Sequence, residues 1–128
     1  MIKGIVTAKR EAIVNVSLHG PTGRKVLVKA VVDTGFNRFV CVPPAVIARL
    51  RLLWVRRGRA ILADGSDSFF DTYEGIVSWD GRALSIPIYE VEAHPLVGMA
   101  LLEGHELKAE VRMGGRVTIK RLPRRRRT

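Results

Sequence analysis

Val26-Leu27-Val28-Lys29-Ala30-Val31-Val32-Asp33-Thr34-Gly35 is the stretch that decides the fold of this chain. Its first seven residues are mostly apolar and β-branched, which is typical of a buried strand. The strand runs into a carboxylate followed by Thr and Gly, where the chain must turn sharply. A buried Asp is costly unless it is hydrogen-bonded, paired or used in chemistry, so Asp33 is the first candidate for a functional residue.

Strand patterns also dominate the rest of the chain, and turn residues separate them. His19-Gly20-Pro21-Thr22-Gly23 is a clear turn, and Asp64-Gly65 and Asp80-Gly81 are dipeptides typical of tight hairpins. The expected strands are residues 2–8, 12–18 and 25–32, two hairpins within residues 59–91, and a last hairpin of residues 106–112 and 116–121.

Two short helices interrupt these strands. Pro43-Pro44 begins the first, because a proline costs nothing at the first helical position. The apolar residues Val46, Ile47 and Leu50 then repeat at helical spacing. A second helix is expected from about Met99 to residue 103, ending at a glycine that can take the left-handed cap.

The bulk composition is that of one ordinary globular domain. The chain has 128 residues, of which 47% are hydrophobic and 27% charged, so it can build one sizeable core but not two. Its formal net charge is +10, and Lys120, Arg121 and residues 124–127 contribute six of these charges, which leaves about +4 for residues 1–119. We expect a domain over residues 1–120 and a disordered basic tail over residues 121–128.

Other chemistries find little support in the sequence. Cys41 is the one cysteine, so no intrachain disulfide can form, and its apolar neighbours favour a buried structural thiol in a reducing compartment. The three histidines are scattered, and we expect no metal site and no cofactor. The N-terminus lacks the pattern of a signal peptide, and no apolar run approaches the ~18 residues that span a bilayer. We therefore expect a cytoplasmic protein that does not enter the membrane.

A second apolar-apolar-Gly block, Leu96-Val97-Gly98, lies near the other end of the chain. Together with Asp33-Thr34-Gly35 it resembles the retropepsin-like (clan AA) aspartic proteases, and most closely the bacterial single-domain type. The resemblance covers residues 2–119. Within it, residues 31–36 look like the catalytic loop, residues 42–50 like the proline-led helix of the bacterial members, residues 62–66 like the tip of the flap hairpin, and residues 96–104 like the strand, turn and helix that support the catalytic loop.

The resemblance implies a mostly β acid-protease fold, a closed barrel with one or two short helices and one catalytic loop per subunit. An aspartic peptidase needs two carboxylates that share a proton. The chain has one Asp-Thr-Gly and is too short for two such lobes, so activity requires a symmetric homodimer with Asp33 of each subunit beside the twofold axis. The expected reaction is hydrolysis of peptide bonds in extended peptide or unfolded protein substrates. We expect the terminal strands, whose edges lie open in so small a barrel, at the dimer interface.

The residues around Asp33 take supporting roles. Gly35 allows the turn and brings a backbone N–H near the carboxylate. The resemblance implies that the Thr34 hydroxyl bonds across the dimer axis to its mate, and that Gly98 lets its strand pack against the catalytic loop. Viral members usually have Ala or Ser after the triplet, and here Phe36 narrows the floor of the cleft.

The same resemblance gives the substrate-binding flap, whose tip is Ala63, Asp64 and Gly65. It closes over an extended substrate and hydrogen-bonds the substrate backbone. Read without the resemblance, Asp64-Gly65 is a plain hairpin turn and Asp33-Thr34-Gly35 a structural turn.

Two other functions stay open. The same fold can serve as a catalytically idle module that binds peptides or a partner protein. A small basic β-domain can also bind nucleic acid through the arginines of residues 49–59 and, weakly and without specificity, through the tail.

Overall fold

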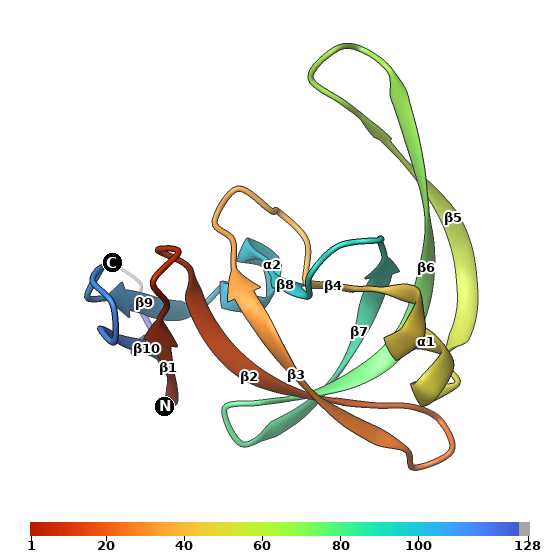
Figure 1. Ribbon diagram of the computed structural model, residues 1–128. Coiled ribbons are helices and arrows are strands. Elements are labelled where there is room, and N and C mark those ends of the chain that lie inside the picture. Colours follow the sequence, from red (N-terminus) through yellow and green to blue (C-terminus); the bar gives the residue numbers. More distant parts are fainter. Residues whose placement is uncertain (126–128) are drawn as a thin grey trace.

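The computed structural model describes residues 1–125, which form a mostly β fold with two short helices (Figure 1). The mostly β class predicted from the sequence is confirmed. In chain order the elements are β1 (Ile2–Val6), β2 (Ala12–His19), β3 (Lys25–Val32), β4 (Val40–Val42), α1 (Pro44–Leu50), β5 (Leu53–Ile61), β6 (Asp67–Trp79), β7 (Arg82–Glu90), β8 (Leu96–Val97), α2 (Met99–Leu102), β9 (His105–Ala109) and β10 (Arg116–Arg121).

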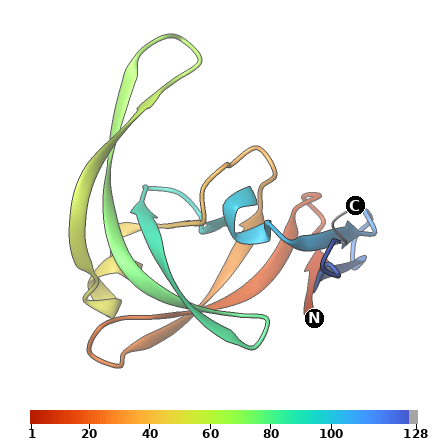
Figure 2. The same cartoon turned by 180° about the vertical axis from the view of Figure 1, so that it is seen from behind.

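The centre of the fold is a closed ring of strands, seen from opposite sides in Figures 1 and 2. β6, β7, β4, β8, β3 and β2 pair in that order, and a further pairing of β2 with β6 closes the ring. The pairings of β3 with β8 and of β4 with β7 are parallel. Parallel partners come from distant parts of the chain, so the first of these pairings sets Val32, the residue before Asp33, beside Val97.

Alternating side chains fill the interior of the ring. β2 buries Val14, Val16 and Leu18, while the residues between them are more exposed. α1 adds Ile47 and Leu50 to the same core. Fully burying one such side chain stabilises a protein by ~1.5–3 kcal/mol, so the ring forms a rigid frame for the loops that leave it.

The two hairpins expected within residues 59–91 are present and share a strand, so β5, β6 and β7 form one meander. β6 has 13 residues and lies between the two turns, each of which has its glycine at positive φ as the turn dipeptides predicted. β7 pairs with β6 only from Thr72 onward, so residues 67–71 pair with β5 alone. A β-bulge between Trp54 and Arg56 lies opposite Thr72 and Tyr73, where the pairing of β7 with β6 ends. This two-stranded part is the hairpin that extends beyond the ring in Figure 1.

The terminal strands continue the sheet on the other side of the ring. β1 pairs with β2 and β10, and β10 also pairs with β9. Both edges of β1 and of β10 are thus occupied within the chain. The expectation that the terminal strands leave open edges is wrong for these two strands, because the β9–β10 hairpin folds back onto β1 (Figure 2).

The described chain end belongs to this sheet extension. Arg121, expected as the first residue of a basic tail, is the last residue of β10, and the N–H of Leu122 donates to the carbonyl oxygen of Gly104 at 2.9 Å. Residues 126–128 of the expected tail lie outside the described residues. Within the described part, neither helix is long and apolar enough to cross a membrane.

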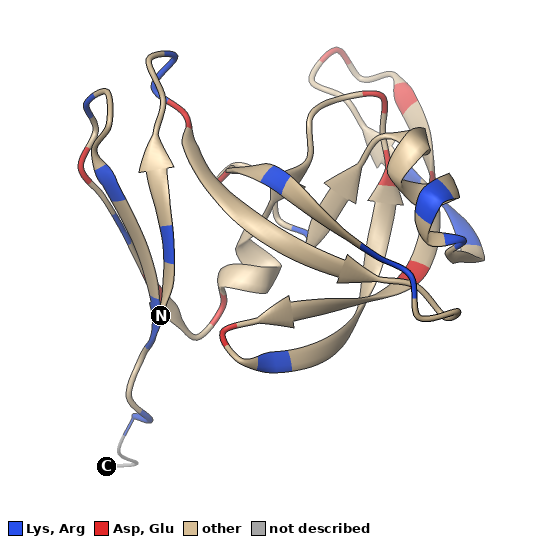
Figure 3. Cartoon of the chain, turned by 60° about the horizontal axis from the view of Figure 1, so that its bottom comes forward, with Lys and Arg blue, Asp and Glu red and all other residues tan. Residues whose placement is uncertain are grey.

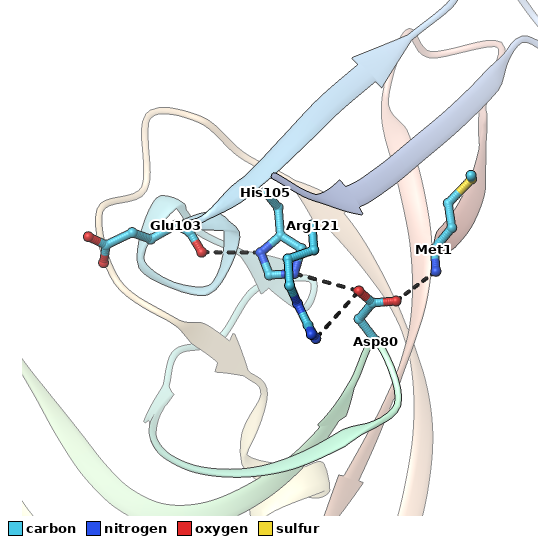
Figure 4. Close-up of polar contacts among 5 residues, drawn as sticks. All are labelled: Met1, Asp80, Glu103, His105 and Arg121. Atoms are coloured by element: carbon cyan, nitrogen blue, oxygen red, sulfur yellow. Dashed lines mark hydrogen bonds and ion pairs between the residues drawn. The ribbon is translucent and has the colours of Figure 1, made fainter. Parts of the chain in front are cut away.

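Asp80, in the turn between β6 and β7, ties the terminal strands to the ring (Figure 4). Its carboxylate lies 2.7 Å from the amino group of Met1, 3.7 Å from the guanidinium of Arg121 and 3.9 Å from Nε2 of His105. The hydrogen bond from the amino group, followed by the charges of all three groups, holds the pKa of the Asp80 carboxyl below its usual value. This carboxylate therefore stabilises the folded chain in its ionised form.

Replacing Asp80 with Asn should lower the melting temperature at pH 7, because the amide cannot pair with these cations. A depressed carboxyl pKa stabilises the fold above the unfolded pKa of about 3.9 and loses that effect as the pH falls through the folded value. The difference in melting temperature from the parent should thus shrink below about pH 4. Thermal denaturation followed by circular dichroism between neutral and acidic pH measures it. A difference that persists unchanged at low pH would contradict a charge effect.

Candidate active site

Asp33 lies directly after β3 in a turn that its own carboxylate stabilises. Its backbone N–H donates to the carbonyl oxygen of Val97 at 2.9 Å, and its Oδ1 accepts the N–H of Gly35 at 2.9 Å. The N–H of Phe36 closes the turn on the Asp33 carbonyl oxygen at 3.1 Å. Among residues 1–125, no hydrogen bond reaches the other carboxylate oxygen, Oδ2. That oxygen is available for chemistry.

The loop of residues 33–39 is held from behind by the segment that joins β8 to α2. The N–H of Gly98 donates to the carbonyl oxygen of Phe39 at 2.9 Å, and the N–H of Met99 donates to that of Phe36 at 2.7 Å. The N–H of Ala100 donates in the same way to the carbonyl oxygen of residue 38. Backbone bonds of this kind fix the path of the loop whatever its side chains.

Gly98 is placed so that only a glycine fits. A Cβ there would overlap the carbonyl oxygen of Arg38, and it would lie 2.5 Å from Cδ2 of Phe36 and 2.6 Å from the Phe36 carbonyl oxygen. Its backbone is extended, with φ of −106°, so the need for glycine is steric. The two sequence blocks, Asp33-Thr34-Gly35 and Leu96-Val97-Gly98, are therefore packed backbone to backbone.

Thr34 and Gly35 lie exposed at the tip of this loop. Met99, the first residue of α2, lies directly behind the loop and is 45% exposed although it is apolar. The loop tip and the side chain of this methionine are thus both uncovered in the single chain.

Next to the loop is an apolar pocket of about 400 Å³ beneath the extended β5–β6 hairpin. Asp33 does not line it, but Phe36 of the same loop does. The residues that line the pocket are Phe36, Arg38, Cys41, Ala60, Leu62, Ser68, Phe70, Tyr89, Val91, Ala93 and Leu96. Arg38 is the one charged residue among them.

The expected flap residues Ala63, Asp64 and Gly65 form the tip of the hairpin and are exposed. Asp64 caps its own turn: its Oδ1 accepts the N–H of Ser66 at 2.9 Å and also the Ser66 hydroxyl, and the hydroxyl bond is the main cause that lowers the pKa of the Asp64 carboxyl. The tip does not line the pocket. The hairpin lines it instead through Leu62, next to the tip, and through residues of its two strands.

Those lining residues of the hairpin are Leu62, which belongs to the segment 62–66 expected as the flap tip, and Ala60, Ser68 and Phe70, which sequence reasoning missed. The sequence feature that could have found the residues on the strands is the alternation of side chains along each strand. Successive side chains of a strand point to opposite faces, so Phe69 and Phe70 lie on different sides of β6. The sequence alone does not say which of the two faces the loop.

Cys41 contributes to the pocket wall without being reactive. It is 3% exposed, and burial is the main cause that raises the pKa of its thiol, to which the nearby negative charge of Asp33 adds. A thiol with a raised pKa is protonated at neutral pH and a poor nucleophile. No group of three metal-binding side chains occurs in residues 1–125.

Replacing Gly98 with Ala should lower the free energy of unfolding by about 3 kcal/mol, the upper part of the range for overpacking, because backbone atoms must move. Urea denaturation measures the loss. Gly23→Ala is the control: a Cβ there meets nothing within 4 Å, so only the positive φ of 81° is costly, by about 1–2 kcal/mol. An equal loss in both variants would show that the close approach at residue 98 does not hold the loop.

No protein-family model matches the chain, and no curated protein matches its sequence. Among solved structures it is similar to the EIAV protease complexed with the inhibitor HBY-793, a retroviral enzyme. The superposition has a TM-score of 0.53 and covers 75% of this chain and 88% of the viral protease, with 14% sequence identity. At this identity the likeness concerns the fold alone. The chain has the retropepsin-like fold that its sequence predicted.

Proposed function

We propose that this protein is a homodimeric aspartic endopeptidase in which Asp33 of each subunit forms the catalytic dyad. The observation that carries the proposal is the Asp33 turn itself. One carboxylate oxygen is fixed by the N–H of Gly35, the other is open, and an apolar pocket lies alongside. A retropepsin-like fold with this turn beneath an extended hairpin supports peptide hydrolysis better than any other chemistry of the described residues.

The mechanism follows from two like carboxyl groups in contact. The charge of the first carboxylate opposes ionisation of the second, so the pair holds one proton, and one Asp33 is a base while its mate is an acid. The base takes a proton from a water molecule, whose oxygen attacks the peptide carbonyl carbon while the acid protonates the carbonyl oxygen. The C–N bond of the resulting diol then breaks as its nitrogen takes a proton, which leaves a carboxyl and an amine. Activity needs one proton on the pair, so it declines at high pH as both groups ionise.

The β5–β6 hairpin is proposed as the flap. It extends the sheet above the pocket, and an extended peptide can lie between hairpin and loop with alternate side chains entering the pocket. Ala63, Asp64 and Gly65 then close over the substrate backbone. Ala60, Leu62, Ser68 and Phe70 contact substrate side chains.

The dimer interface is proposed to include the loop tip. Thr34 and Gly35 are exposed there, and the exposed apolar side chain of Met99 gives a second copy something to bury. β1 and β10 use both of their edges within the chain, so among the described terminal strands β9 is the one whose outer edge can pair with a second subunit.

Within the retropepsin-like group we propose the bacterial single-domain type. Its support is the proline-led helix α1, which begins two residues after β4. A cytoplasmic location is proposed from the single, buried Cys41.

A basic surface favours nucleic acid as a second candidate partner. Lys and Arg gather on α1 and the segment beside it (Figure 3). The residues are Arg49, Arg51, Arg56, Arg57 and Arg59, all exposed. We propose that these residues and the tail bind nucleic acid at most weakly and without specificity. Retention on nucleic acid that survives moderate salt would favour the nucleic-acid function over the peptidase.

The dimer should sediment near 28 kDa, twice the chain mass of 14.2 kDa. Met99→Glu should weaken dimerisation by about tenfold or more, because it places a charge in the interface. Met113→Glu is the matched control, since Met113 is 78% exposed in the β9–β10 turn, away from the loop. Sedimentation equilibrium at micromolar concentrations measures both. A parent protein that stays monomeric with and without a bound peptide would contradict the dyad.

Asp33→Asn should reduce peptide cleavage by about 10²–10⁴-fold or more, since the amide cannot take the proton of the water molecule. The fold and the dimer should survive, because the amide oxygen still accepts the N–H of Gly35. Glu11→Gln, an equal charge change in the β1–β2 turn, serves as the control. Cleavage of a mixed peptide library followed by mass spectrometry measures activity. Full activity in Asp33→Asn would refute the mechanism, whereas an inactive parent that binds peptides would identify the idle binding module.

A further inference from the structure

Arg38 occupies an unusual position in the wall of the pocket. Its guanidinium lies 5.1 Å from the ring centre of Phe70 and 5.0 Å from that of Tyr89. The two rings meet edge to face with their centres 5.2 Å apart, and Nη1 of Arg38 donates to the Tyr89 hydroxyl at 3.3 Å. The side chain is therefore held in place by the hairpin strand β6 and by β7 together.

The charge of Arg38 is not neutralised by the part of the chain that the structure describes. Within residues 1–125 no carboxylate forms an ion pair with it. Glu90 and Glu92 line the adjoining hollow, which shares Ser68, Phe70 and Val91 with the pocket, but they do not line the pocket itself. A guanidinium carries five N–H donors, and the bond to Tyr89 uses one of them. The other donors can bind a ligand at the pocket.

The remaining lining tells which ligand fits. Apart from Arg38, the wall is mainly aliphatic and aromatic, and the polar groups in it are the hydroxyls of Ser68 and Tyr89 and the thiol of Cys41. Such a wall accepts an apolar stem, and a fixed guanidinium pairs best with a planar carboxylate. A carboxylate on a methylene stem, as in a glutamate side chain, matches both features.

We propose that Arg38 makes this pocket selective for a substrate side chain that ends in a carboxylate, so that the peptidase acts on acidic peptide segments. The proposal rests on the proposed peptidase function and names its substrate class. Arg38 comes from the same loop as Asp33, five residues later, so the selecting group and the dyad share one rigid segment. The positive net charge of the chain also favours encounter with acidic segments.

A purely structural role of Arg38 is the competing explanation, and the chain offers a matched control for it. Arg57 of β5 stacks on the ring of Phe69 at 5.2 Å, almost the same distance as the contacts of Arg38. Arg57 does not line the pocket. Loss of stacking alone therefore affects both arginines, whereas loss of carboxylate recognition affects only Arg38.

The test compares peptide sets in which each position in turn carries Glu, Gln or Lys. The parent enzyme should cleave the Glu peptide at least about tenfold faster, in kcat/KM, than the Gln peptide at one position, the effect of a charge-assisted hydrogen bond. Arg38→Gln should bring this ratio to about one, and Arg38→Glu should shift the preference to Lys. Arg57→Gln should leave the ratio unchanged. Circular dichroism checks the fold of each variant. If Arg38→Glu unfolds, Arg38→Lys replaces it. Arg38→Lys keeps the charge without the planar fork of the guanidinium, so it should retain part of the preference for Glu.

A second arm measures binding of the same Glu and Gln peptides to the Asp33→Asn variant by calorimetry, which needs no catalysis. Tenfold tighter binding of the Glu peptide, lost on adding Arg38→Gln, supports the proposal. Cleavage with equal rates for Glu and Gln at every position would overturn the selectivity and leave the peptidase standing. A parent that cleaves nothing would overturn the peptidase, and the binding arm alone then decides. Equal binding of both peptides, or binding of neither, overturns the role of Arg38.

Discussion

The fit of Gly98 against the loop of residues 33–39 is the contact on which the candidate site depends. A loop that carries a carboxylate with one free oxygen needs its backbone fixed by something other than that carboxylate. Here the backbone N–H groups of Gly98 and Met99 fix the loop through hydrogen bonds to its carbonyl oxygens. They reach the loop only because residue 98 has no side chain. The parallel pairing of β3 with β8 supplies the alignment, since it sets Val32 beside Val97. The ring of strands therefore contributes to the site mainly by bringing into contact two short segments that lie about sixty residues apart in sequence.

Sequence patterns predicted the parts of the fold that local rules determine. The turns at Asp64-Gly65 and Asp80-Gly81 could be predicted because a glycine readily adopts the positive φ that such turns require, and both glycines do so. The start of α1 could be predicted because a proline such as Pro44 suits the first helical turn. The resemblance, and not the patterns, supplied the contact of Gly98 with the loop. Single residues such as Asp33 could be proposed because a carboxylate after a buried strand needs a reason to be there.

The pocket could not be predicted, and neither could the arrangement of the terminal strands. The pocket walls come from the loop, from the hairpin and from the segments around β4, β7 and β8, and the alternation of Phe69 and Phe70 does not say which ring faces inward. The contact of Arg38 with two rings from different strands depends on the register of the whole meander. The pairing of β10 with β1 depends on the β9–β10 hairpin folding back, a competition between partners that no local pattern decides.

Strand β6 belongs both to the ring and to the extended hairpin, and its pairing determines where the hairpin can bend. From Thr72 to Trp79 the strand β6 pairs with β7, and near its C-terminal end it also pairs with β2. Residues 67–71 pair with β5 alone. The bulge between Trp54 and Arg56 lies where β6 passes from pairing with two strands to pairing with β5 alone. Residues 67–71 have no hydrogen bonds to β7, so the hairpin can bend at the bulge without breaking the pairing of β6 with β7. Phe70 lies in this two-stranded part, and its ring centre is 5.1 Å from the guanidinium of Arg38, so bending of the hairpin acts on the loop that carries Asp33 through this contact.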